Sequence, residues 1–238
     1  MRAWVVLIIA SQLAPTGCDP TAADCKVLVK ELNESVDRLR PQRVTDAGPP
    51  TEVAGAMRLF GAAVTKETDQ IAAVTLEAPA LVAARDAYVA AARQTAAAAI
   101  GWADAVDARH RARREGDAAK AALDRNLDEL DERCRGSACF ELMKRLAAPT
   151  TTPSSALHTA LGALADELGG ITTDDPAIDA AIAQHRIELG RLAAALKSMR
   201  EAEAETDRHR QTLAGAAAVE TAAVDRICLL YTSPSPRD

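Results

Sequence analysis

The most restrictive feature of the sequence is the long run from Pro79 to Arg133, in which apolar residues recur every three or four positions. This spacing places them on one face of an α-helix, and proline is well tolerated in a first helical turn. A second run of the same character extends from Pro176 to Ile227. The sequence therefore predicts two long helices. The apolar face of the first includes Leu81, Tyr88, Ala92, Ala99, Trp102, Val106, Leu123, Leu127 and Leu130.

Shorter helices are predicted in front of each long one. The same periodicity predicts helices over residues 24–40, from a Thr51 cap to Val74, over 140–147 and over 157–168. The chain is 48% hydrophobic but only 3% aromatic, and runs of alternating strand character are missing. Alanine favours helix and buries little area, so we expect an all-α fold of slender helices, either an elongated helical bundle or an antiparallel coiled coil.

The two halves of the chain resemble each other in order. The sequence CKVLVKEL resembles CFELMKRL, VTLEAPAL resembles ITTDDPAI, RHRARREG resembles RHRQTLAG, and KAALDR resembles TAAVDR. This order predicts two tandem helical-hairpin repeats, at residues 25–133 and 139–227, with a connector at 134–138. In each repeat an arm of two shorter helices would lie antiparallel along the long helix. Gly116 and Gly215 fall at matching places, where we favour continuous helices over a fold-back.

The first 17 residues have the layout of a leader. Arg2 precedes a short apolar run, and small residues lead to Gly17 and Cys18. The apolar run is too short to span a bilayer. This layout resembles a bacterial lipoprotein signal peptide, and the rest resembles alanine-rich bacterial lipoproteins in general style. The resemblance implies removal of residues 1–17, a lipidated Cys18, a tether over 18–24, and a periplasmic or outer-membrane location in the cell envelope. An ordinary secretory peptide is the alternative.

The last 11 residues, CLLYTSPSPRD, resemble the translation of a sequencing-library transposase adapter. This resemblance implies that residues 228–238 are not native sequence and that the native chain continues past Ile227. They are therefore excluded from predictions about the fold.

Three cysteines remain once Cys18 and Cys228 are set aside, and export would permit them to form disulfides. The hairpin arrangement would bring Cys25, at the start of the arm, to the same open end as Cys134. A Cys25–Cys134 disulfide is therefore predicted. The rival pairing is Cys134–Cys139, which would close a small local loop.

Few residues are candidates for a functional site. Tyr88 and Trp102 lie on the apolar face, where they are expected to fill the core or contact a ligand, and His110 and His209 occupy matching RHR segments. The segment around His110 is expected to face solvent or the acidic segment EAEAETD of the other long helix. No metal-binding, haem or catalytic motif is present, so we expect no cofactor, metal or enzymatic site.

The function expected from these features is that of a lipid-anchored scaffold or protein-interaction module. It would bind a protein partner or a second copy of itself. The formal net charge of −6 gives no electrostatic reason to expect nucleic acid binding. The alternative is a periplasmic bundle that binds a small ligand in a pocket between the long helices near Trp102.

Overall fold

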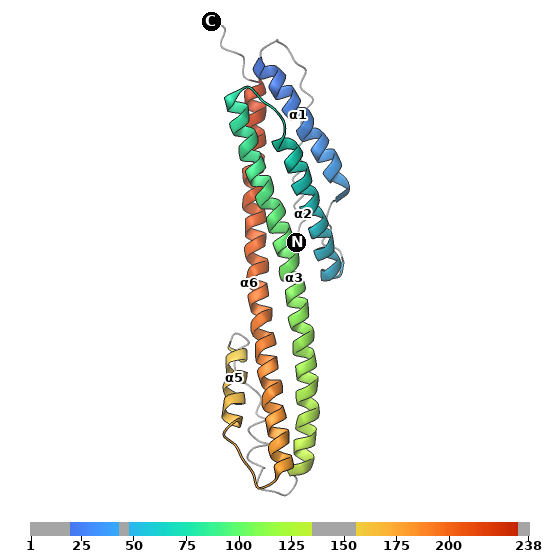
Figure 1. Ribbon diagram of the computed structural model, residues 1–238, viewed down its shortest axis with the longest axis vertical. Helices are drawn as coiled ribbons and strands as arrows, with labels where there is room; N and C mark the ends of the chain where they lie inside the picture. Colours follow the sequence, from blue (N-terminus) through green and yellow to red (C-terminus); the bar gives the residue numbers. More distant parts are fainter. Residues whose placement is uncertain (1–19, 43–47, 135–155, 233–238) are drawn as a thin grey trace. The chain divides into compact units, whose positions relative to one another are not determined.

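The computed structural model describes residues 20–42, 48–134 and 156–232, and within them all regular secondary structure is helical (Figure 1). The prediction of an all-α fold is confirmed. The elements are α1 (Pro20–Leu39), the 3₁₀ helix η1 (Arg40–Gln42), α2 (Pro50–Ala72), α3 (Pro79–Cys134), α5 (Leu157–Leu168) and α6 (Pro176–Thr232).

None of these described helices combines the length and the hydrophobicity that crossing a bilayer requires.

The predicted starts of the two long helices are accurate. α3 begins at Pro79 and α6 at Pro176, and both helices run without interruption past Gly116 and Gly215, as predicted. Two other boundaries are wrong. Thr51 is not a cap, because α2 already begins at Pro50 with Pro49 as its N-cap residue. The first helix starts before residue 24, because α1 begins at Pro20.

The chain divides into two compact units. The first unit comprises Met1–Val106 and Ala204–Asp238, and the second comprises Asp107–Glu203. The first unit therefore contains α1, α2, the first part of α3 and the last part of α6. The second contains α5, the last part of α3 and the first part of α6.

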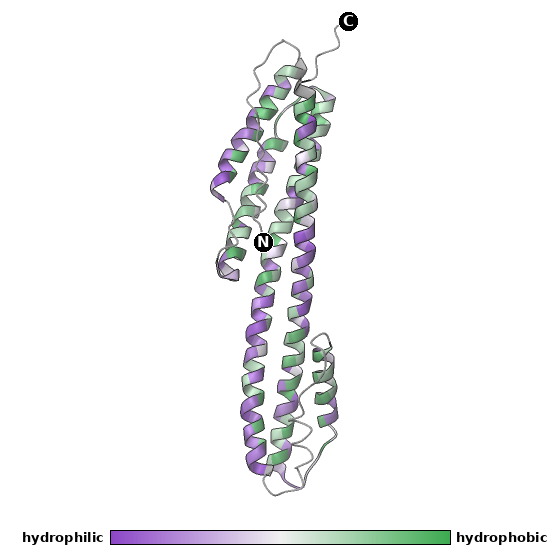
Figure 2. Ribbon diagram, turned by 180° about the vertical axis from the view of Figure 1, so that it is seen from behind, coloured by the Kyte–Doolittle hydropathy of each residue, from purple (hydrophilic) through white to green (hydrophobic). Residues whose placement is uncertain are grey.

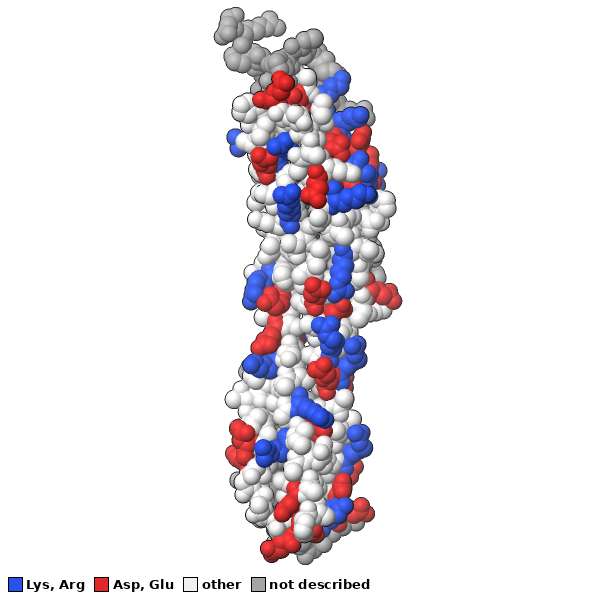
Figure 3. Space-filling view, viewed as in Figure 1, with Lys and Arg blue, Asp and Glu red and all other residues white. Residues whose placement is uncertain are grey.

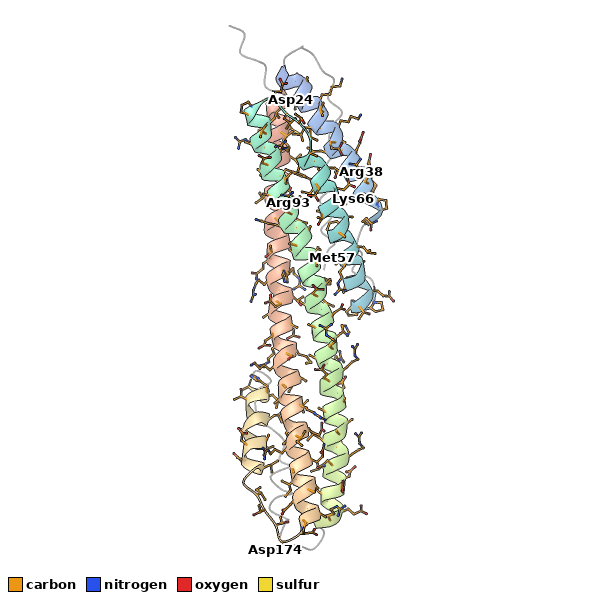
Figure 4. All side chains as sticks on the ribbon, viewed as in Figure 1. Asp24, Arg38, Met57, Lys66, Arg93 and Asp174 are labelled. Atoms are coloured by element: carbon orange, nitrogen blue, oxygen red, sulfur yellow. The ribbon has the colours of Figure 1, made fainter. Side chains whose placement is uncertain are left out.

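Helix α1 lies beside the C-terminal part of α2 and runs antiparallel to it. At its start, Asp24 Oδ2 accepts hydrogen bonds from the backbone N–H groups of Glu77, at 2.6 Å, and Ala78, at 2.8 Å. Near its end, Arg38 Nε donates to Glu67 Oε2 at 2.6 Å (Figure 4). The predicted arm, with α1 and α2 following each other along α3, is therefore wrong. Asp24 instead ties α1 to the turn between α2 and α3.

The core of the first unit joins all four of its helices. Its fully buried side chains include Leu28 of α1, Ile71 of α2, Leu81 of α3 and Ile227 of α6. Alanines of α3 fill much of the remaining seam. Alanine buries little area per residue, so close approach of the helices compensates for the small size of each contact.

The core of the second unit forms where α5 covers α3 and α6. Leu161 and Leu168 of α5 pack in one cluster with Ile178 and Ile182 of α6 and with Leu130 of α3. Outside these clusters hydrophilic residues alternate with hydrophobic ones along the long helices (Figure 2). This amphipathic pattern buries one face of each helix and leaves the other to solvent.

Within the second unit the long helices pack in antiparallel fashion. Arg109 of α3 forms an ion pair with Glu203 of α6 at 2.9 Å. Seven residues further along α3, a Cβ placed on Gly116 would lie 3.5 Å from Ala195 Cβ. Buried positions of α3 alternate at spacings of four and three residues, the spacing of a coiled-coil seam. They are Ala112, Gly116, Ala119, Leu123, Asn126 and Leu130.

Many buried positions in one unit have a buried counterpart in the other unit 97 residues away in the sequence. This is the spacing that separates Pro79 from Pro176. Pairs at this spacing occur in the short helices, at the starts of the long helices and at their ends. They are Val64 and Leu161, Ile71 and Leu168, Leu81 and Ile178, Tyr88 and His185, Asn126 and Ala223, and Leu130 and Ile227. The two units therefore share one burial pattern.

Candidate functional site

The two aromatic candidates lie in the first unit, in different clusters. Tyr88 is buried in the core that joins α1, α2, α3 and α6. Trp102 is half-buried and packs with Ala54, Ala103, Val106 and Met57, between α2 and α3. Both therefore contribute packing.

A polar group that the sequence analysis missed lies near Tyr88. Thr95 Oγ1 donates a 2.5 Å hydrogen bond to Glu220 Oε1 across the seam between α3 and α6. Burial raises the pKa of Glu220, although the hydrogen bond from Thr95 acts in the opposite direction. Burial, with contributions from the carboxylates of Glu220 and Glu67, raises the pKa of the Tyr88 phenol well above its usual range. The signal for Glu220 was its position on the apolar face of α6.

The two histidine candidates lie in different units and are not brought together. His110 is half-buried in the second unit, whereas the ring of His209 lies against Gly101 in the first unit. His209 Nε2 is 3.8 Å from Glu205 Oε2. At the 97-residue spacing, His209 corresponds to Ala112. The matching RHR segments therefore do not mark equivalent positions in the burial pattern.

Charged residues of the long helices pair in the way that the sequence suggested. The Arg109–Glu203 ion pair joins the basic segment of α3 to the acidic segment of α6. On the visible face of the molecule, basic and acidic side chains are interspersed and do not gather by sign (Figure 3). Exposed ion pairs of this kind contribute little to stability, so their main effect is on helix orientation.

Cys25 does not lie where the hairpin prediction required. Cys25 is buried beside the turn between α2 and α3, forms no disulfide, and directs its Sγ toward the carbonyl oxygen of Ile227 at 3.8 Å. Burial, together with the nearby Cys228, raises the pKa of this thiol to about 11. The predicted Cys25–Cys134 disulfide is therefore absent. The rival pair with Cys139 lies outside the described residues, as does Cys18.

A groove with a volume of about 580 Å³ lies between α3 and α6 in the second unit. Its lining includes small side chains, namely Ala118, Ala119, Ala122, Ala194, Ala195 and Ser198. It includes neither Tyr88 nor Trp102, so the pocket predicted near Trp102 is not the cavity found here.

Four charged side chains also line this groove. Glu115 and Arg125 contribute from α3, and Glu188 and Arg191 contribute from α6. Glu188 is buried, and its Oε1 accepts hydrogen bonds from Gln184 Nε2 and Arg191 Nη1, each at 2.8 Å. The groove therefore combines small side chains with charges of both signs.

Among the described residues, no three histidine, cysteine, aspartate or glutamate side chains lie close enough together to hold a metal ion. Comparisons of the chain with protein-family models, with curated proteins and with solved structures found no match.

Proposed function

We propose that the chain is a lipid-anchored helical scaffold of the bacterial cell envelope that binds a protein partner and has no catalytic role. The observation that carries this proposal is the groove of the second unit. Its alanines allow a partner helix to approach closely, and its exposed charged residues, such as Glu115 and Arg125, offer a carboxylate and a guanidinium group. The matching partner is an amphipathic helix with small residues on one face and charges of both signs beside it.

Photo-crosslinking from the groove tests this proposal. A photoreactive side chain at Ala118, which lines the groove, is expected to give one discrete adduct in the native host. The matched control is Ala121, which is exposed on the same helix but does not line the groove. The adduct should disappear when Ala194→Trp fills the groove. Equal crosslinking from both positions, or an adduct that persists in Ala194→Trp, would contradict the proposal.

The lipid anchor has a separate test at Cys18. The intact protein is expected to incorporate labelled palmitate and to fractionate with membranes. Cys18→Ala should lose the label and leave the membrane fraction, because the acyl chains supply the membrane affinity. Export of an unlabelled protein that begins at another residue would instead indicate an ordinary secretory peptide.

A small ligand is the second candidate occupant of the groove. The lining combines small apolar side chains with carboxylate and guanidinium groups, as the site of a small polar ligand requires. Native mass spectrometry of the full chain separates the two candidates. A small molecule retained by the unmodified protein but lost from Ala118→Trp, without a protein adduct, would replace the scaffold proposal by a ligand-binding one.

We also propose that the two units descend from one duplicated hairpin. The 97-residue spacing supports this proposal, because it aligns buried positions in α2 with those in α5 and positions along α3 with those along α6. It also corrects the sequence alignment at RHR and at KAALDR, whose spacings are 99 and 101 residues.

A further inference from the structure

Two buried polar residues lie at the same level of the seam in the second unit. Gly116 of α3 faces Ala195 of α6, and the helices run antiparallel. Ten residues forward along α3 is Asn126, and ten residues back along α6 is His185. Both helices rise by the same distance over ten residues, so Asn126 and His185 form one layer of the seam. Asn126 is 8% exposed and His185 is 5% exposed.

This layer is incompletely hydrogen-bonded. Asn126 Oδ1 and His185 Nδ1 are both buried, and neither atom has a hydrogen-bond partner among the described residues. A buried polar atom without a partner costs free energy, and adding a charge to it costs considerably more. The corresponding residues of the first unit are Tyr88 and Ala223, which belong to its hydrophobic core. The second unit thus has a titratable layer where the first has a largely apolar one.

The described elements around His185 offer little to stabilise a positive charge. From α5, the buried residues Leu161, Ala165 and Leu168 face the core, whereas Asp166 and Glu167 are exposed. From α3, Leu123, Asn126 and Leu130 occupy the seam, and Glu129 is paired with Arg133.

On α6 itself, the nearest acid on the buried face is Glu188, which is already engaged by Gln184 and Arg191. Arg186 lies on the same helix and adds positive charge near Gly169. The environment of His185 therefore favours the neutral imidazole.

We propose that the Asn126–His185 layer is an acid-sensitive element, in which protonation of His185 loosens the packing of α5 and α6 in the second unit while the core of the first unit stays closed. Burial lowers the pKa of His185 below its usual value of 6.5. The stabilising effect of the neutral imidazole is complete above the unfolded-state pKa and is lost as the pH falls toward the folded-state pKa. The sensitive window therefore lies below about pH 6.5.

Hydrogen exchange of the full chain tests this proposal. Exchange rates at about pH 7.5 and pH 5.0, corrected for intrinsic chemistry, give opening constants for each segment. Residues 157–168 and 178–189 are expected to open about tenfold more at the lower pH, since one proton changes the constant by up to about tenfold per pH unit. Residues 64–71 and 81–92 should change much less.

Two variants identify the responsible group. His185→Gln should abolish the acid-induced opening, whereas His110→Gln, in the same unit, should retain it. Asn126→Ala with His185→Tyr installs the layer of the first unit and should also abolish it, which covers the case in which His185→Gln does not fold. Acid-induced opening that survives in either His185 variant would overturn the proposal, as would equal opening in both units of the unmodified chain.

Discussion

Replacing Ile71 by alanine is expected to lower the free energy of unfolding of the first unit by about 2–5 kcal/mol. Ile71 is fully buried in α2, within the core that also holds Leu28, Leu81 and Ile227. Truncation removes apolar contact and leaves a cavity that four packed helices cannot fully close. Denaturant unfolding, together with hydrogen exchange over α2 and α3, measures the loss.

The matched control for this prediction is Leu59, on the same helix. Its side chain is 66% exposed, so Leu59→Ala should change the free energy of unfolding by no more than about 0.5 kcal/mol. Similar losses from Ile71→Ala and Leu59→Ala would show that α2 does not pack against α3 through the face described here.

Replacing Gly61 by alanine is expected to destabilise the first unit by about 1–3 kcal/mol, although alanine normally favours a helix. A Cβ at position 61 would lie 2.7 Å from Ile100 Cγ1 and 2.9 Å from the carbonyl oxygen of Ala96. The Ile100 side chain can adjust, but the backbone oxygen of Ala96 can move only if α2 and α3 separate. Thermal unfolding followed by circular dichroism measures the effect.

Gly55, also in α2, provides the control for Gly61. Nothing lies within 4 Å of a Cβ placed there, so Gly55→Ala should stabilise the helix by up to about 1 kcal/mol. Opposite signs for the two glycines are the expected result. Stabilisation by both substitutions would mean that α2 and α3 do not approach closely at Gly61.

The sequence predicted the helices well because their determinants are local. Proline at a first helical turn fixed the starts of α3 and α6, and the spacing of leucine and alanine identified their buried faces. The position of α1 could not be predicted in the same way. It depends on hydrogen bonds from Glu77 and Ala78 to Asp24, more than 50 residues away in the chain. The wrong position predicted for Cys25 follows from the wrong position predicted for α1.

The candidate site was predicted less well because it depends on contacts between helices. His185 and Glu220 lie at positions of α6 where the spacing of apolar residues predicts burial. Whether His185 Nδ1 has a hydrogen-bond partner, however, depends on the neighbouring helices. Half of the residues that line the groove are alanines. Alanine is frequent throughout the sequence, and the sequence alone does not predict which alanines another helix buries. The similarity of the RHR segments was misleading, since burial aligns the halves at a different spacing.

The regular seam of the second unit has an evolutionary consequence. Its spacing of four and three residues repeats every seven positions, so each heptad adds two layers of side chains to the seam. Insertion or loss of one heptad in both long helices would leave all the remaining layers in phase. A change in only one helix would instead shift the pairing of every residue beyond it. Homologous proteins are therefore expected to differ in length by matched seven-residue steps in the two helices.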